Sequence, residues 1–254
     1  ECRCHKHSIK ASRSLIHHVL HTMIDPNAQL FLYEECLLLA LRDDTGTSAS
    51  GVSLGFGLGA SLLADLLLIN RVEVEQDGKR SFLKLIDDSS TGDDLLNECI
   101  TKIKTAKRRA QLQTWVQRFS ALKKLKERAA VKLCDRGILK HEEGTVLFVF
   151  KRQLYPEIDG RAEKEIISRL KRAIFTQTRE MEARTVVLIS LANSTGLLRA
   201  NFDKKKLKER KKRITQITEG EFIGKAAADA VQAAVTAAAM VAIMPAMTAT
   251  VISS

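Results

Sequence analysis

Five basic side chains lie close together in the middle of the chain, in a pattern that suits the binding of phosphate. Lys123 and Lys126 are three residues apart, so on a helix they would lie one turn apart along one side. Lys124, Arg128 and Lys132 recur every four residues and would line a second side. A phosphate group is bound well when several cationic donors converge on its oxygens. Lys123 and Lys126 are therefore the first candidates for an anion-binding site.

Apolar residues in the same stretch predict the helix that must position these cations. Leu122, Leu125, Ala129 and Leu133 recur at three- and four-residue spacing, so they form one apolar stripe. Gly137 follows, and glycine readily adopts the left-handed conformation that ends a helix. We therefore expect one helix that includes this stripe and carries its basic residues on the other sides.

Other helices are indicated by caps and by charge. Asp93 and Asp94 predict a helix start, because their carboxylates accept hydrogen bonds from free N–H groups and suit the positive end of the helix. An amphipathic helix is predicted over residues 161–175, with Arg169 facing outward. Residues 203–213 include eight basic residues and are predicted to form a solvated helix face.

Two stretches share the order helix, strand, turn, strand. In the first, alternation at 72–75 and 80–85 around Asp77-Gly78 predicts a β-hairpin. In the second, a strand is predicted from Ile138, with a turn at Glu143-Gly144 and a returning strand over 146–150. The fold class predicted is mainly α, a single compact helical domain with two short β-hairpins. Helix-plus-hairpin units look like winged helices, which makes nucleic acid an alternative partner.

The predicted returning strand is apolar on both faces. It consists of Val146, Leu147, Phe148, Val149 and Phe150. Such a strand must be covered on both faces or enter an apolar medium. It is therefore either buried in the core or a candidate for membrane contact.

Five segments, in order, carry a resemblance to a known family. They are LYEECLLLALRDDTGT (Leu32–Thr47), LLADLLLINRVEVE (Leu62–Glu75), TGDDLLNECI (Thr91–Ile100), LKERAAVKLCDRGIL (Leu125–Leu139) and RTVVLISLANSTGLL (Arg184–Leu198). The chain resembles the Golgi phosphoprotein 3 family, whose eukaryotic members are phosphoinositide-binding peripheral membrane proteins. The resemblance implies binding of anionic phospholipid headgroups, phosphatidylinositol 4-phosphate above all, at the cytoplasmic face of a membrane. It also implies self-association through the second hairpin and an adaptor role for short protein tails.

The resemblance further implies where a headgroup would bind. Eukaryotic members present two arginines at the positions of Lys123 and Lys126, and lysine keeps their charge but not their bidentate geometry. They also use a further arginine and a tryptophan, where this chain has Gly59 and about Ser50. These departures favour a bacterial relative, so a Golgi location is expected only if the source is eukaryotic.

Composition and charge agree with a helical protein that has a polyanionic partner. The chain has 254 residues, 45% of them hydrophobic and 5% aromatic, with three prolines, which favours a single helix-rich domain. Its net charge of +11 points to anionic lipid or, less favoured, nucleic acid. Three regions are predicted: a basic, His-rich helical extension over 1–27, a Golgi phosphoprotein 3-like domain over 28–221 and an Ala-rich packing helix over 222–254.

Several other kinds of site are not favoured by the sequence. Cys2 and Cys4 with nearby histidines lack the second ligand group of a structural zinc site, so no metal or other cofactor is expected. The glycine-rich run at 51–60 contains G-x-G-x-x-A but follows small polar residues rather than a strand, which argues against a dinucleotide site. The run after residue 222 is long enough to span a bilayer, but alanine and Pro245 favour packing. No catalytic motif is found, so the protein is not expected to be an enzyme.

Overall fold

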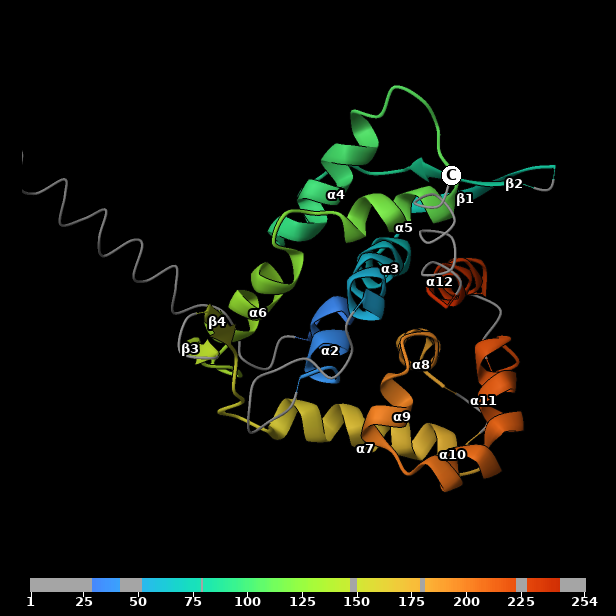
Figure 1. Ribbon diagram of the computed structural model, residues 1–254. Helices are drawn as coiled ribbons and strands as arrows, with labels where there is room; N and C mark the ends of the chain where they lie inside the picture. The colour runs from blue at the N-terminus through green and yellow to red at the C-terminus, as the bar shows by residue number, and fades with distance from the viewer. Residues whose placement is uncertain are drawn as a thin grey trace, which may run out of the picture. The chain divides into compact units, whose positions relative to one another are not determined.

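The computed structural model describes most of the chain, and its elements are shown in Figure 1. The residues described are 29–41, 52–78, 80–146, 150–178, 181–222 and 228–242. Contacts divide the chain between Leu30 and Phe31, and every element named below belongs to the second unit. The predicted N-terminal extension over 1–27 lies outside the described residues, as do Ser50 and the end of the chain after residue 242.

The described residues are mainly helical with two antiparallel hairpins, which confirms the predicted fold class. The helices are α2 (Leu32–Leu38), α3 (Val52–Leu68), α4 (Asp94–Lys104), α5 (Leu112–Ser120), α6 (Leu125–Asp135), α7 (Arg161–Phe175), α8 (Ala183–Ser194), α9 (Leu197–Asn201), α10 (Lys204–Glu209), α11 (Lys211–Thr218) and α12 (Ala228–Met240). The strands are β1 (Val72–Asp77), β2 (Arg80–Leu85), β3 (Glu142–Val146) and β4 (Phe150–Leu154).

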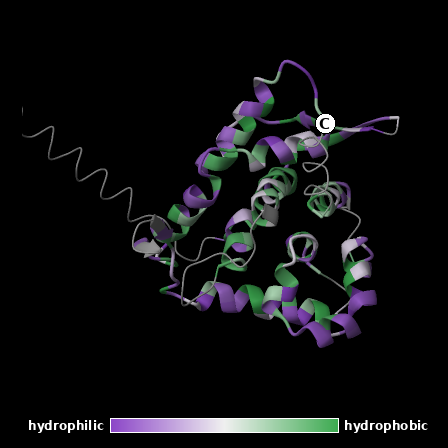
Figure 2. Cartoon of the chain, in the orientation of Figure 1, coloured by the Kyte–Doolittle hydropathy of each residue, from purple (hydrophilic) through white to green (hydrophobic). Residues whose placement is uncertain are grey.

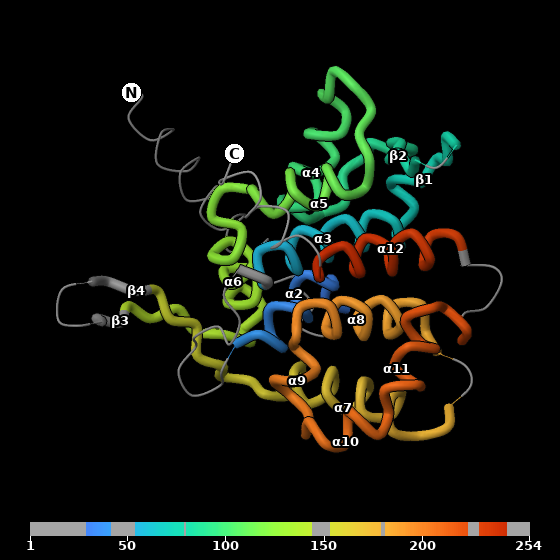
Figure 3. Tube along the Cα trace, turned by 45° about the vertical axis from the view of Figure 1, so that its right-hand side comes forward, coloured from blue at the N-terminus to red at the C-terminus, as the bar shows by residue number. Residues whose placement is uncertain are grey.

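Helix α3 forms the centre of the core. It contacts α2, α5, α8 and α12, and it lies between α5 and α12 in both views of the backbone (Figures 1 and 3). Leu62, Leu63 and Leu66 are fully buried. In Figure 2, α3 and α12 are largely hydrophobic, whereas α7 and α11 mix polar and apolar residues as helices with one solvated face do.

The glycine-rich run is the first part of α3, so it is not a phosphate-binding turn between a strand and a helix. Its glycines allow close packing instead. A Cβ atom at Gly59 would lie 2.6 Å from the backbone nitrogen of Ser120 and 2.7 Å from the carbonyl oxygen of Val116, both in α5. The backbones of α3 and α5 therefore approach each other directly at this point.

The first hairpin confirms its prediction. Strands β1 and β2 pair from Val72 with Leu85 to Asp77 with Arg80, and Gly78 between them has a φ of 60°. A positive φ carries no steric penalty for glycine, which is why the turn forms there.

The second hairpin forms, but its turn is not where the sequence predicted it. Gly144 pairs with Arg152 and Val146 pairs with Phe150, so the predicted turn at Glu143-Gly144 is wrong. Thr145 and Val146 have high strand propensity and extend β3 beyond the glycine. The apolar run therefore begins at the end of β3 and ends at the start of β4. Its members Leu147, Phe148 and Val149 lie outside the described residues.

Buried ion pairs connect α2 to the helices around it. Glu34 binds Arg136 at 3.0 Å, and Glu35 binds Arg169 of α7 at 2.7 Å. Arg169 was predicted to face outward, and this prediction is wrong, because the arginine turns inward to a carboxylate that is 4% exposed. A further buried carboxylate, Asp65 of α3, accepts hydrogen bonds from the backbone of α2, and burial raises its pKa to about 8.

The basic run over 203–213 is helical, and its basic side chains are exposed up to Lys212, as the sequence predicted. It is divided between α10 and α11, with Arg210 at the junction. Arg213 turns inward and donates to the carbonyl oxygens of Ala173 at 2.7 Å and Thr178 at 2.6 Å. The predicted solvated face is therefore confirmed except at Arg213, which satisfies carbonyl groups near the end of α7.

Candidate functional site

Lys123 and Lys126 lie at the junction of α5 and α6 and not along a single helix. Lys123 belongs to the turn before α6, and Lys126 belongs to the first turn of α6. The helix begins at Leu125, because Lys124 takes a left-handed conformation with a φ of 53°. The buried stripe of Leu122, Leu125, Ala129 and Leu133 is nevertheless as predicted, and so is the helix end at Gly137.

The two lysines differ in their surroundings. Lys123 is exposed, and no described residue forms an ion pair or hydrogen bond with its side chain. Lys126 is half-buried and already makes a contact of its own. Lys123 and the likewise exposed Lys124 are therefore the cations of this junction most available to an external anion.

The left-handed backbone conformation of Lys124 leads to a testable prediction about stability. A residue with a side chain loses about 1–2 kcal/mol in this conformation, which glycine adopts freely at a smaller entropic cost. We expect Lys124→Gly to raise the free energy of unfolding by about 0.5–1 kcal/mol, as measured by urea denaturation. A fall in stability would show that the Lys124 side chain makes contacts that outweigh the backbone strain.

The second predicted face of α6 is neutralised by acids of α4. Arg128 binds Glu98 at 2.6 Å, and Lys132 lies 3.3 Å from Asp94. Asp93, the predicted cap of α4, accepts from the backbone N–H of Leu96 at 2.9 Å. Arg128 and Lys132 therefore hold α6 against α4, and their charges are less available to a ligand than that of Lys123.

The base of the second hairpin lies beside α6. A cavity of about 510 Å³ is bordered by Lys124 and Val131 of the α6 segment and by His141, Gln153 and Tyr155 at the base of the hairpin. His141 stacks on Tyr155 and contacts Gln153 across the two strands. The hairpin therefore begins on the side of α6 that carries Lys124.

The structure explains why no cation stands at position 59. Gly59 is buried in α3 against the backbone of α5, so this position has no space for a side chain. The position of about Ser50 is outside the described residues. Of the four headgroup positions that the family resemblance implied, only Lys123 and Lys126 can supply charge here.

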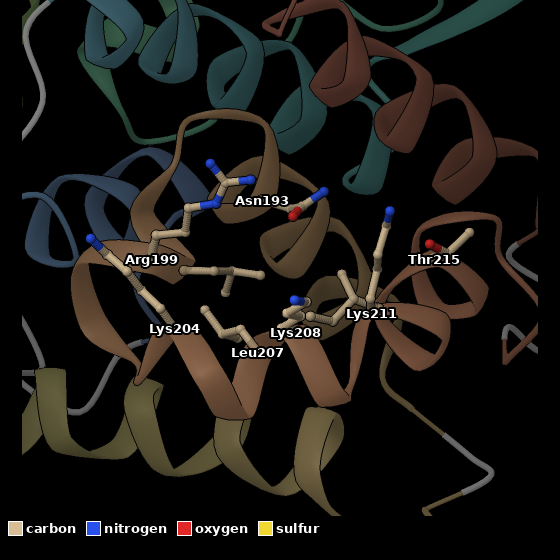
Figure 4. A pocket seen from close by; sticks show the side chains of 9 residues that line it. Asn193, Arg199, Lys204, Leu207, Lys208, Lys211 and Thr215 are labelled. Carbon is tan, nitrogen blue, oxygen red and sulfur yellow. The ribbon is translucent and has the colours of Figure 1, made fainter.

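A second basic surface, which the sequence indicated only through its run of lysines, lies on α9 to α11. A cavity of about 570 Å³ is bordered by Arg199, Lys204, Lys208 and Lys211, with Leu207 among the apolar residues that line it (Figure 4). In that view the ends of Arg199 and Lys211 lie on the same side of Leu207. Arg199 could not have been predicted, because it comes from a separate helix whose position depends on tertiary packing.

The two basic surfaces are separated within the helical unit. Helices α10 and α11 lie on the far side of α3, α8 and α12 from α4 and α5 in both backbone views (Figures 1 and 3). The junction of α5 with α6 and the groove of α9 to α11 are therefore distinct basic surfaces.

The described part of the chain holds neither a cluster of metal-ligating side chains nor a helix suited to cross a membrane. No three His, Cys, Asp or Glu side chains there gather closely enough to hold a metal ion. None of the described helices has both the length and the apolar character that crossing a bilayer requires.

Comparison with known proteins finds a matching family and several related proteins. A family model described as Golgi phosphoprotein 3 matches residues 32–234. The chain is also 25% identical over 201 residues to vacuolar protein sorting-associated protein 74 of Eremothecium gossypii. That alignment covers 66% of this chain and 60% of the relative. Neither description refers to an enzymatic activity.

Proposed function

This chain belongs to the Golgi phosphoprotein 3 family, and on that premise we propose that it is a peripheral membrane protein that binds anionic phospholipid headgroups. Lys123 and Lys126 bind the headgroup phosphate, and the apolar run from Val146 to Phe150 enters the bilayer beside them. The observation that carries the proposal is the exposed Lys123, which has no carboxylate partner among the described residues, at a position where eukaryotic members of the family have a headgroup-binding arginine.

Electrostatic attraction supports the proposal both at long range and close to the membrane surface. The net charge of +11 attracts the chain to an anionic surface, and each basic residue close to that surface contributes about 1 kcal/mol. Arg128 and Lys132 add less, because Glu98 and Asp94 neutralise them. The attraction at close range therefore depends mainly on the junction of α5 and α6.

The headgroup preference follows from the side chains present. The family resemblance points to phosphatidylinositol 4-phosphate, but two lysines bind phosphate as point charges and lack the fork of arginine. Gly59 adds no donor. We therefore propose that binding follows the number of phosphate charges on the lipid and discriminates weakly between phosphoinositide isomers.

The apolar run from Val146 to Phe150 is the basis for proposing how the protein contacts the bilayer or a second copy of itself. Five apolar residues at the end of a hairpin are suited to contact with acyl chains or with the same hairpin of a second copy. The protein would act on the cytoplasmic face of a membrane without catalysing a reaction. An adaptor role for short protein tails would be compatible with the same orientation.

Vesicle co-sedimentation tests the proposal. We expect Lys123→Ala plus Lys126→Ala to weaken binding to vesicles containing phosphatidylinositol 4-phosphate by about 2 kcal/mol, or roughly 30-fold, since two membrane-proximal cations are lost. The thermal melting temperature of the double variant checks that Lys126 is not needed for folding.

The matched control is Lys204→Ala plus Lys208→Ala, which removes the same charge from the groove of α9 to α11. It should retain most of the binding, because that groove lies on the far side of the core. Equal losses in the two double variants would show that net charge alone drives association, and unchanged binding of Lys123→Ala plus Lys126→Ala would remove this site assignment.

A further inference from the structure

A third basic cavity lies between the end of α4 and α5, and one of its lining residues, Ala121, stands at the start of the junction of α5 with α6. Its volume is about 570 Å³. Its charged lining consists of Lys102, Lys107, Arg108 and Arg118, and no acidic side chain borders it. Four positive charges around a space of this size favour a ligand with several negative charges.

The ion pairs nearby leave these four cations largely uncompensated. Lys104 binds Asp88 at 2.5 Å, and Arg109 contacts Asp77, so the two neighbours of this segment are neutralised by acids in or just after the first hairpin. Lys107 and Arg108, which lie between them, have no ion pair with a described residue. Lys102 lies 4.0 Å from Glu98, and that carboxylate also binds Arg128 at 2.6 Å.

A buried aromatic ring with an arginine stacked on it also borders this cavity. Trp115 lines it and is 1% exposed. Its Nε1 is buried and has no hydrogen-bond partner among the described residues. The Arg118 guanidinium lies 4.6 Å from the centre of the Trp115 ring and fixes the orientation of the two groups. A ligand that binds the Arg118 guanidinium would therefore change the surroundings of the Trp115 ring.

We propose that this cavity is a binding site for a compact ligand that carries two or more phosphate groups. The Arg118 guanidinium, stacked on the Trp115 ring, donates hydrogen bonds to one phosphate group. Lys107 and Arg108 close over the second phosphate from the exposed side. The source of the phosphate groups is either a free phosphorylated compound or a lipid headgroup. This site does not depend on Lys123 or Lys126.

Binding at this site can be measured through Trp115, because it is the single tryptophan of the chain. We expect inorganic pyrophosphate, added at constant ionic strength, to change the tryptophan emission in a saturable way. In a ¹⁵N-labelled sample the one indole N–H signal should shift as the Arg118 guanidinium over the ring binds the phosphate. An indole signal that stays in place at saturating pyrophosphate would overturn the proposal whatever the variants show.

A matched pair of variants tests the cations. Lys107→Ser plus Arg108→Ser should weaken pyrophosphate binding about tenfold or more, as expected for the loss of charge-assisted hydrogen bonds. Lys104→Ser plus Arg109→Ser removes the same charge from neutralised neighbours and should bind nearly as well as the unchanged chain. Equal weakening by the two double variants would overturn the proposal, because the response would then reflect net charge.

Vesicles identify the source of the phosphate. An emission change with phosphatidylcholine vesicles containing phosphatidylinositol 4-phosphate, suppressed by pyrophosphate, would assign the site to a lipid headgroup. A response to pyrophosphate alone would assign it to a free phosphorylated compound. Lys123→Ala plus Lys126→Ala should keep the pyrophosphate response, so failure of this site and failure of the proposed membrane function can be told apart.

Discussion

Gly59→Ala is expected to lower the free energy of unfolding by about 1–3 kcal/mol, the usual cost of forcing extra atoms into a packed interior. The new methyl group would lie 2.6 Å from the backbone nitrogen of Ser120 and 2.7 Å from the carbonyl oxygen of Val116. Backbone atoms cannot rotate away as the end of a side chain can, so α3 and α5 would have to separate. Urea denaturation of the purified chain measures the change.

Gly55→Ala is the matched control, since Gly55 lies in the same helix and a Cβ atom there would meet nothing within 4 Å. Alanine is favoured over glycine within a helix by about 0.5–1 kcal/mol, so this variant should be more stable than the unchanged chain. If both substitutions stabilise the protein, α3 and α5 are not in backbone contact at Gly59.

The backbone contact of α3 with α5 at Gly59 also decides whether position 59 could help to bind a headgroup. Placing the arginine of the eukaryotic relatives at this position should destabilise the fold more than alanine does, and it should not restore a headgroup site. Loss of that arginine is therefore coupled to the close approach of α3 and α5, and a regained charge would need a wider spacing of the two helices.

Glu35→Ala is expected to cost about 3–5 kcal/mol of folding stability, because it removes the carboxylate from a buried ion pair and leaves the cations behind. Glu35 lies 2.7 Å from Arg169 and 3.4 Å from Arg184, and it is 4% exposed. Both arginines are largely buried, with side chains 16% and 15% exposed. They would lose this partner in a region where water can replace it only in part. Thermal and urea denaturation measure the loss.

Glu73→Ala provides the comparison at a similar distance. Glu73 binds Lys84 at 2.8 Å across the first hairpin, and both side chains are about half exposed. Exposed pairs contribute about 0–1 kcal/mol, so the effect should be small. Similar losses at Glu35 and Glu73 would contradict the view that burial, and not the ion pair itself, determines the cost.

Much of the fold could be predicted because its signals are local. The cap at Asp93, the stripe that includes Leu125 and Leu133 and the glycine end at Gly137 act within a few residues, and all three are present in the structure. The first hairpin was placed correctly for the same reason, since Asp77-Gly78 defines its turn. The second hairpin was misplaced, because strand pairing continued past Gly144 against residues of β4.

The candidate site was less predictable, because the acidic residues that pair with its cations lie far from them in the sequence. Helical spacing grouped Lys124, Arg128 and Lys132 on one face, yet acids of α4 neutralise the last two. Arg169 was expected in solvent, but its partner Glu35 lies 134 residues away. No local pattern reports such a partner.

The sequence by itself determined the family, the helical class and the positions of most helices, because caps, turns and apolar stripes are properties of short segments. Only the tertiary structure decided which cations are available to an anion. Folding brings acidic groups close to some basic residues and not to others. The tertiary structure also decided that position 59 has no space for a side chain and that Trp115, Lys107, Arg108 and Arg118 border one cavity. Contacts of this kind arise from the packing of whole helices against one another, which residue spacing does not specify.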